Sequence, residues 1–189
     1  MAYTFFDDFV GIPPIVSTLA PTTSLVQGAT TVYPASALGR VPGPRAGLMV
    51  EATDPIYGAG KFIYLLGVAS TVVGSVVTWD GATAGTPTFQ TVLAPSTANL
   101  DQPLAVAMSA NLAGLWGWYQ VYGNAVVATN GVLIAGPGPV FLAGAGQVTS
   151  AVAAGKQVLN ARNETATGTP AAGQAVVQIM YPSAQGQIT

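Results

Sequence analysis

The chain has 189 residues and a mass of 19.0 kDa, which suits one domain with an extension. Only 6% of its residues are charged, where an average soluble domain has about 25%, and the net charge is −2. The five basic residues are scattered, which argues against nucleic-acid binding because contact with a phosphate backbone needs clustered Lys and Arg. So few charges predict a surface that other protein covers extensively.

Histidine and cysteine are absent from the whole chain. The usual general base is therefore missing, as are thiolate chemistry, disulfides and the preferred ligands of zinc. The pairs Gly60-Lys61 and Gly155-Lys156 lack the second Gly and the Ser or Thr that a phosphate-binding loop requires. We therefore predict no catalytic residue, no metal and no cofactor, and a protein that is not an enzyme.

Residues 1–45 are rich in proline, which prevents helix and removes the backbone donors that a central strand needs. We predict an extended N-terminal arm whose tip carries four aromatic residues, Tyr3, Phe5, Phe6 and Phe9. The tip is too apolar to remain in water, so it either folds back on its own core or lies on a neighbouring subunit. We predict the second arrangement. The acidic residues Asp7 and Asp8 stand where a signal peptide has its apolar run, so we expect a protein made in the cytoplasm and not secreted.

Residues 46–189 are predicted to form the body. Short apolar or alternating runs are separated by turn signals at intervals of about 8–12 residues, which is typical of an all-β sandwich or barrel. The uncharged run from Phe62 to Trp79 is about long enough to cross a bilayer. However, it is rich in Val and Thr and is interrupted by Gly67 and Gly74. It therefore predicts two strands around a turn near Thr71, and no membrane partner.

The stretch from Leu115 to Tyr122 alternates with the period of a β-strand. One face of the predicted strand holds Trp116, Trp118, Gln120 and Tyr122. The other face holds Leu115, Gly117, Tyr119 and Val121. The pairs Gly123-Asn124 and Asn130-Gly131 are typical of hairpin turns, as is Asp80-Gly81 earlier in the chain. The sequence thus predicts a meander of antiparallel strands between about Gly47 and Pro182, with no helix of three turns between Lys61 and Ile134.

Two interpretations of Trp116, Trp118 and Tyr122 are open. The three rings are able to form a stacking platform for a sugar or a base. Alternatively, one face of the strand belongs to the core and the other to a subunit interface, where Trp and Tyr are enriched. The low charge of the chain favours the interface.

Three blocks of residues carry a resemblance to a known family. They are Gly60-Lys61-Phe62-Ile63-Tyr64-Leu65-Leu66-Gly67-Val68-Ala69-Ser70, Gly74-Ser75-Val76-Val77-Thr78-Trp79-Asp80, and Ala105-Val106-Ala107-Met108-Ser109-Ala110-Asn111 followed by Gly117-Trp118-Tyr119-Gln120-Val121-Tyr122-Gly123. In this order they resemble the small decoration (cement) proteins of tailed-bacteriophage heads. The likeness covers roughly residues 58–127, with a looser echo in 175–182, and does not include the arm.

The resemblance implies a structural virion protein with a compact, often jelly-roll-like fold. Such a protein binds the outer surface of an icosahedral capsid and bridges subunits of the major capsid protein. We further expect a homo-oligomer, a dimer or a trimer. The alternative from another class is a carbohydrate-binding or host-attachment β-module of a virion, which would bind through the Trp116 and Trp118 face.

Overall fold

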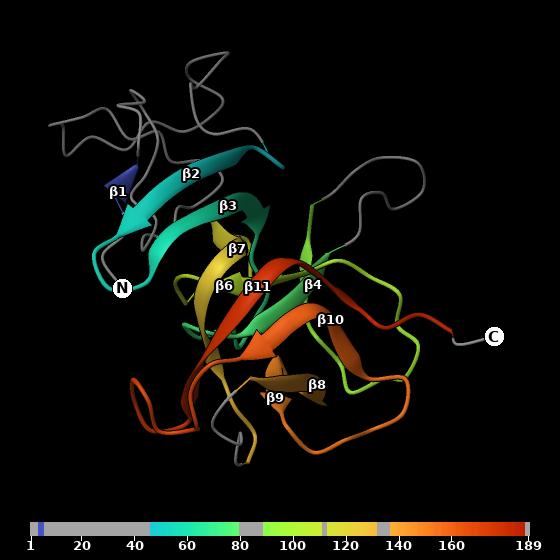
Figure 1. The fold of residues 1–189 in the computed structure, drawn as a ribbon. Helices are drawn as coiled ribbons and strands as arrows, with labels where there is room; N and C mark the ends of the chain where they lie inside the picture. Colours follow the sequence, from blue (N-terminus) through green and yellow to red (C-terminus); the bar gives the residue numbers. More distant parts are fainter. Residues whose placement is uncertain (1–3, 6–45, 80–88, 111–112, 132–136, 188–189) are drawn as a thin grey trace, which may run out of the picture.

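The computed structural model describes residues 4–5, 46–79, 89–110, 113–131 and 137–187. These residues form eleven strands of a single antiparallel sheet that curls into a half-barrel, and they include no helix (Figure 1). The prediction of an all-β body is therefore confirmed for the described residues. No helix within these ranges is long and apolar enough to cross a membrane.

The strands have the following bounds: β1 Thr4–Phe5, β2 Met49–Asp54, β3 Gly58–Leu66, β4 Val76–Trp79, β5 Thr91–Leu93, β6 Leu104–Ala107, β7 Trp116–Ala128, β8 Gly138–Gly144, β9 Gln147–Thr149, β10 Gln157–Asn163 and β11 Gln174–Ala184. The uncharged run at 62–79 thus supplies most of β3 and all of β4, as expected for two strands around a turn.

The main path through the sheet follows the order β1-β2-β3-β7-β11-β10-β8-β9. A branch leaves this path at β7, where β6 pairs with β7, β4 pairs with β6, and β5 pairs with β4. In Figure 1, β2 and β3 lie at one end of the molecule and β8, β9 and β10 at the other, with β7 and β11 running between them. Strand β7 is therefore the element that joins the two ends.

The predicted hairpin turn at Gly123-Asn124 is wrong, because β7 continues through both residues for 13 residues in all. Gly123 has a φ of 99°, which is the kind of angle that a hairpin turn requires, yet the chain bends there without reversing. A side chain is excluded at this position, since a Cβ would collide with the backbone carbonyl of Ala59 on β3. The side-chain amide of Gln120 stabilises the bend by donating to the carbonyls of Tyr122 and Asn124, at 3.0 and 3.2 Å.

The other two predicted turns meet different outcomes. Strands β4 and β5 pair antiparallel, with Trp79 opposite Thr91, so the chain does reverse between them. Asp80-Gly81 itself lies outside the described residues. Asn130-Gly131 is a bend at the end of β7, and the strand expected at 132–134 is also outside the described part.

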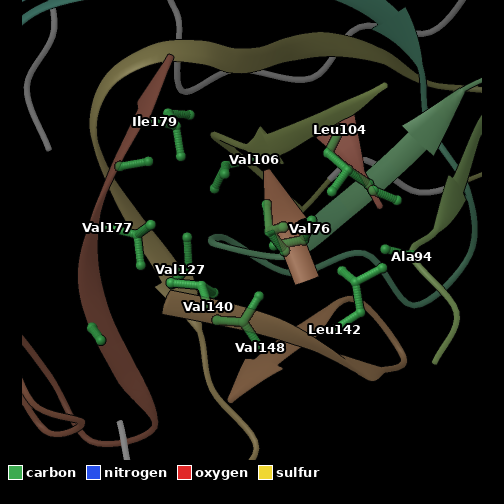
Figure 2. Close-up of a cluster of buried hydrophobic side chains, with 14 residues drawn as sticks. Val76, Ala94, Leu104, Val106, Val127, Val140, Leu142, Val148, Val177 and Ile179 are labelled. Atoms are coloured by element: carbon green, nitrogen blue, oxygen red, sulfur yellow. The ribbon is translucent and has the colours of Figure 1, made fainter. Parts of the chain in front are cut away.

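The largest buried cluster, which we call the aliphatic core, consists only of Val, Ala, Leu and Ile. These side chains come mainly from β4, β6, β7, β8, β9, β10 and β11, and Figure 2 shows them converging. Small branched residues suit this position, because strands that wrap around a common centre leave room for short side chains only. The members are Val76, Ala94, Leu104, Val106, Ala125, Val127, Val140, Leu142, Val148, Val158, Ala175, Val177, Ile179 and Ala184.

Two further clusters occupy the opposite faces of the first half of β7. On one face, the aromatic cluster contains Val50, Ala52, Phe62, Tyr64, Met108 and Trp118, with Trp116 packed against it. On the other face, the Tyr119 cluster contains Ile63, Leu65, Val77, Ala105, Ala107, Tyr119 and Val121, with Trp79, Phe89 and Leu93 packed against it. The first half of β7, which contains most of the alternating stretch from Leu115 to Tyr122, is thus buried on both sides.

Candidate binding groove

The two tryptophans predicted to lie at an interface belong to the aromatic cluster. Trp118 is fully buried, and its ring lies 4.9 Å from that of Tyr64. Trp116 is partly buried and stacks on the same tyrosine, at 5.6 Å with an angle of 15° between the ring planes. Burial raises the pKa of the Tyr64 hydroxyl to about 12, since the charged form is poorly solvated there. In this chain, then, Trp118 presents no open platform for stacking.

Tyr122 does not share the face of the two tryptophans, contrary to the predicted alternation. Lys61 pairs with Tyr122 while its neighbour Phe62 pairs with Gln120, so Val121 is an extra residue on β7. Such a bulge changes which face the following residue points to. Tyr122 therefore lies on the side of Lys61, where it is 38% exposed.

The arm tip is described only at Thr4–Phe5, which form β1. This two-residue strand pairs antiparallel with the outer edge of β2, with Thr4 opposite Thr53 and Phe5 opposite Ala52. Tyr3, Phe6 and Phe9 lie outside the described residues. Docking of the arm on a partner chain therefore stays a prediction.

A groove of about 310 Å³ lies where Pro103, which precedes β6, forms a bridge with Ser183 of β11, and none of the predicted site residues lines it. Its apolar side is formed by Met49, Ile63, Leu104 and Val121. Ile63 and Val121 also belong to the Tyr119 cluster, so the groove is the open end of that cluster. The mouth of a curled sheet is a common place for a small-molecule site, because side chains there have no facing strand to pack against.

Two aromatic side chains border this groove, Trp79 at the end of β4 and Tyr181 near the end of β11. Trp79 is partly buried against the Tyr119 cluster, whereas Tyr181 is 50% exposed. The ring of Tyr181 also contacts the ring of Tyr122, with centroids 5.9 Å apart and an angle of 49° between planes. The three rings come from three different strands that only the fold brings together.

The polar side of the groove is formed by Asp101, Gln102 and Ser183. Gln102 is held in position at both ends. Its side-chain oxygen accepts a hydrogen bond from the Thr78 hydroxyl at 2.8 Å, and its backbone carbonyl accepts one from the Ala184 amide at 2.8 Å. Asp101 is exposed, and it belongs to neither of the two ion pairs found among the described residues, Lys61–Glu51 and Arg162–Glu164.

The pair of Lys61 and Glu51 lies beside Tyr181. Lys61 Nζ is 2.8 Å from the Glu51 carboxylate. The hydrogen bond to Glu51 and the negative charge of that carboxylate raise the pKa of Lys61, and Tyr181 adds to the effect in the same direction. The lysine charge is thus compensated by a partner within the same sheet.

Backbone strain coincides with this groove. Asp101 has a φ of 50° and Tyr181 has a φ of 52°, both in the left-handed region that favours glycine. Aspartate tolerates this region better than most residues, but a bulky aromatic residue is a genuine outlier there. Strained residues of this kind are enriched at binding sites, where the surrounding structure fixes them in place.

The sequence contains one signal for this groove, the position of Asp101. Asp101 is the last charged residue before a run of uncharged side chains that ends at Lys156. An acid at the border of such a run is a candidate for a specific role. The strain at Tyr181 and the approach of Trp79 depend on long-range pairing, so no local pattern reveals them.

Comparison with known proteins finds no matching protein-family model, no similar curated protein and no similar solved structure. Among the described residues, no three His, Cys, Asp or Glu side chains gather in a way that would hold a metal ion.

Proposed function

We propose that this chain is a structural protein of a bacteriophage virion that binds the outer surface of the capsid and bridges subunits of the major capsid protein. The proposal includes the jelly-roll-like form that the resemblance implies, self-association as a dimer or trimer, and a role without catalysis. It draws on the resemblance of residues 58–127 to decoration proteins and on the character of the surface.

The observation that carries the proposal is that this surface exposes more large hydrophobic side chains than charged ones. The described residues expose eleven large hydrophobic side chains: Leu48, Met49, Ile56, Val72, Val73, Val92, Tyr122, Val152, Leu159, Met180 and Tyr181. The same residues include seven charged side chains, Glu51, Asp54, Lys61, Asp101, Lys156, Arg162 and Glu164, of which Asp54 is buried. A surface with more exposed apolar groups than charges favours contact with other protein.

Symmetry makes weak contacts of this kind effective. A shell offers the same site many times, so a modest apolar interface that is repeated across subunit joints stabilises the whole particle. A surface with few charges also has little charge to desolvate on contact. Ile56 and Val152, each in a loop between two strands, are the most exposed large hydrophobic residues, with 82% and 83% of their surface accessible.

The direct test is co-sedimentation of the purified chain with assembled shells of its phage. We expect wild-type protein to sediment with shells, and Ile56→Asp or Val152→Asp to reduce the bound fraction because a charge then enters an apolar contact. Thr97→Asp is the matched control, since it adds the same charge at an exposed polar position. A wild-type chain that stays in the supernatant would contradict the proposal.

The arm offers a second test, because exchange of β1 between copies would reproduce the observed pairing with β2 across a subunit joint. The chain has no cysteine, so a Thr4→Cys/Thr53→Cys variant carries only the two introduced thiols, and peptide mapping distinguishes a bond between positions 4 and 53 from one between like positions of two copies. Directly opposite residues of an antiparallel pair lie within disulfide reach, at Cα distances of about 4.5–5.5 Å.

On oxidation we expect covalent oligomers, as docking on a neighbouring chain requires. Cross-linked monomers alone would show that the arm pairs with its own body. Deletion of residues 1–15 should then keep the β-sheet circular dichroism and weaken attachment to shells. Unfolding of the truncated chain would instead assign the tip to the protein's own core.

The alternative, a carbohydrate-binding or host-attachment module, is favoured by a different observation, the aromatic and polar groove. The two functions are compatible, because a protein on a capsid surface also faces the host. Retention on a glycan column in the absence of shells tests carbohydrate binding independently of capsid binding.

A further inference from the structure

We propose that the groove between Trp79 and Tyr181 is a binding site for an uncharged saccharide, of the size of a monosaccharide or a disaccharide. This inference does not depend on attachment to a capsid, and it deepens the alternative function given above by naming the site and the class of ligand. It concerns a region of the molecule that includes neither Trp116 nor Trp118.

The shape and lining of the groove match the two-sided chemistry of a sugar ring. A pyranose has an apolar face of C–H groups and a rim of hydroxyl groups. The groove offers aromatic rings from Trp79 and Tyr181 for the first, and the polar atoms of Asp101, Gln102 and Ser183 for the second. Its volume of about 310 Å³ is at the lower end of the range for small-molecule sites.

One of the polar groups, the Gln102 side chain, is positioned before any ligand arrives. Because the Gln102 side-chain oxygen accepts from Thr78, the amide nitrogen of the same group is oriented as a donor. The Asp101 carboxylate supplies acceptors and takes part in no ion pair among the described residues. The Gln102 donor is fixed in this way, which reduces the entropy lost on binding.

The charges around the groove favour a neutral ligand. Glu51 compensates the positive charge of Lys61 at 2.8 Å, which leaves little attraction for an anion. A single exposed carboxylate at the polar side disfavours anions further, and it accepts hydrogen bonds from vicinal hydroxyl groups well. An uncharged, hydroxyl-rich ligand satisfies these conditions together.

Backbone strain supports a binding role over a purely structural one. Asp101 and Tyr181 keep side chains at positive φ, where glycine would relieve strain without loss of the fold. Of the seven non-glycine residues with positive φ among the described residues, these two line the same groove. The side chains are thus held in place at an energetic cost, as expected if they contact a ligand.

The experiment uses the full chain without shells. Saturation-transfer NMR and calorimetric titration measure its binding to glucose, galactose, N-acetylglucosamine and maltose. We expect at least one of these to bind. In Tyr181→Gly, which removes the ring at a φ that glycine favours, and in Asp101→Asn, affinity should fall about tenfold or more. Glu164→Gln, a control at a carboxylate that pairs with Arg162, should bind as wild type.

Three results would overturn the proposal: no binding of any of these sugars, equal affinity in wild type and both groove variants, or loss of binding that follows a loss of folding in both variants. A synthetic peptide of residues 1–15 is titrated as a competitor. If it binds the groove and the sugars do not, the occupant is the arm and the saccharide site is rejected. Shell co-sedimentation of the same variants is scored separately, so failure of the saccharide site and failure of the capsid proposal remain distinguishable.

Discussion

The two halves of β7 lie in cores of different chemistry. The C-terminal half contributes Ala125 and Val127 to the aliphatic core, where every side chain is small or branched. The N-terminal half places Trp118 on one face and Tyr119 on the other, so large rings are buried on both sides. Many small contacts from seven strands stabilise the C-terminal half, whereas a few large side chains carry most of the burial in the N-terminal half. The aromatic half should therefore be the more sensitive to a single truncation.

Truncation of Trp118 is the strongest test of this difference. Trp118→Ala removes a fully buried ring and leaves a cavity beside Tyr64, so we expect a loss of about 3–5 kcal/mol in the free energy of unfolding. Val127→Ala, at the corresponding place in the aliphatic half, should cost about 1.5–2 kcal/mol. Chemical denaturation of both variants measures the two losses. Equal losses would show that the two halves do not differ as described.

The bend between the halves is tested at Gly123. Gly123→Ala forces a Cβ toward the Ala59 carbonyl at a φ of 99°, and we expect it to cost about 2–5 kcal/mol. Gly58→Ala is the matched control, because that glycine also has a positive φ, 77°, but open space around it. The control should cost only about 1–2 kcal/mol. A Gly123→Ala protein as stable as the control would mean that close approach to β3 is not what requires glycine there.

The pH dependence of stability distinguishes the halves again, because a buried tyrosine hydroxyl lies in the aromatic half. The raised pKa of Tyr64, about 12, means that the folded state keeps the proton over a range in which the unfolded chain, with a pKa of about 10, has lost it. Stability should therefore be complete below about pH 10 and fall as the pH rises toward 12. Denaturation midpoints across this range should fall less steeply for Tyr64→Phe than for wild type. Identical slopes would contradict the assignment.

The smallest effect is expected at the strained residue of the groove, outside both halves. Tyr181→Gly should raise the free energy of unfolding by about 1 kcal/mol, since glycine adopts a φ of 52° without strain. Thermal denaturation measures the change. A clear destabilisation would mean that packing of the ring against Tyr122 outweighs the strain.

Much of the fold follows from local pattern alone. The alternation of Leu115–Tyr122 and the uncharged run that supplies most of β3 and all of β4 each predict strands, and the described residues bear this out. Period-two alternation and β-branched residues are properties of neighbouring residues, so the sequence reveals them directly. Low charge and the absence of His and Cys likewise determined which chemistry is open to the chain.

Only the tertiary structure determined those features that depend on pairing between residues far apart in the chain. Gly123-Asn124 has the composition of a hairpin turn, but Ile179 and Gln178 of β11 pair with these two residues and keep the strand continuous. The bulge at Val121 then separates Tyr122 from the tryptophans and directs it toward Tyr181. Local propensity is worth about 1 kcal/mol or less per residue, so a ladder of long-range pairs overrides it. For the same reason the groove, assembled from β2, β3, β4, β6, β7 and β11, has no counterpart in any single stretch of the sequence.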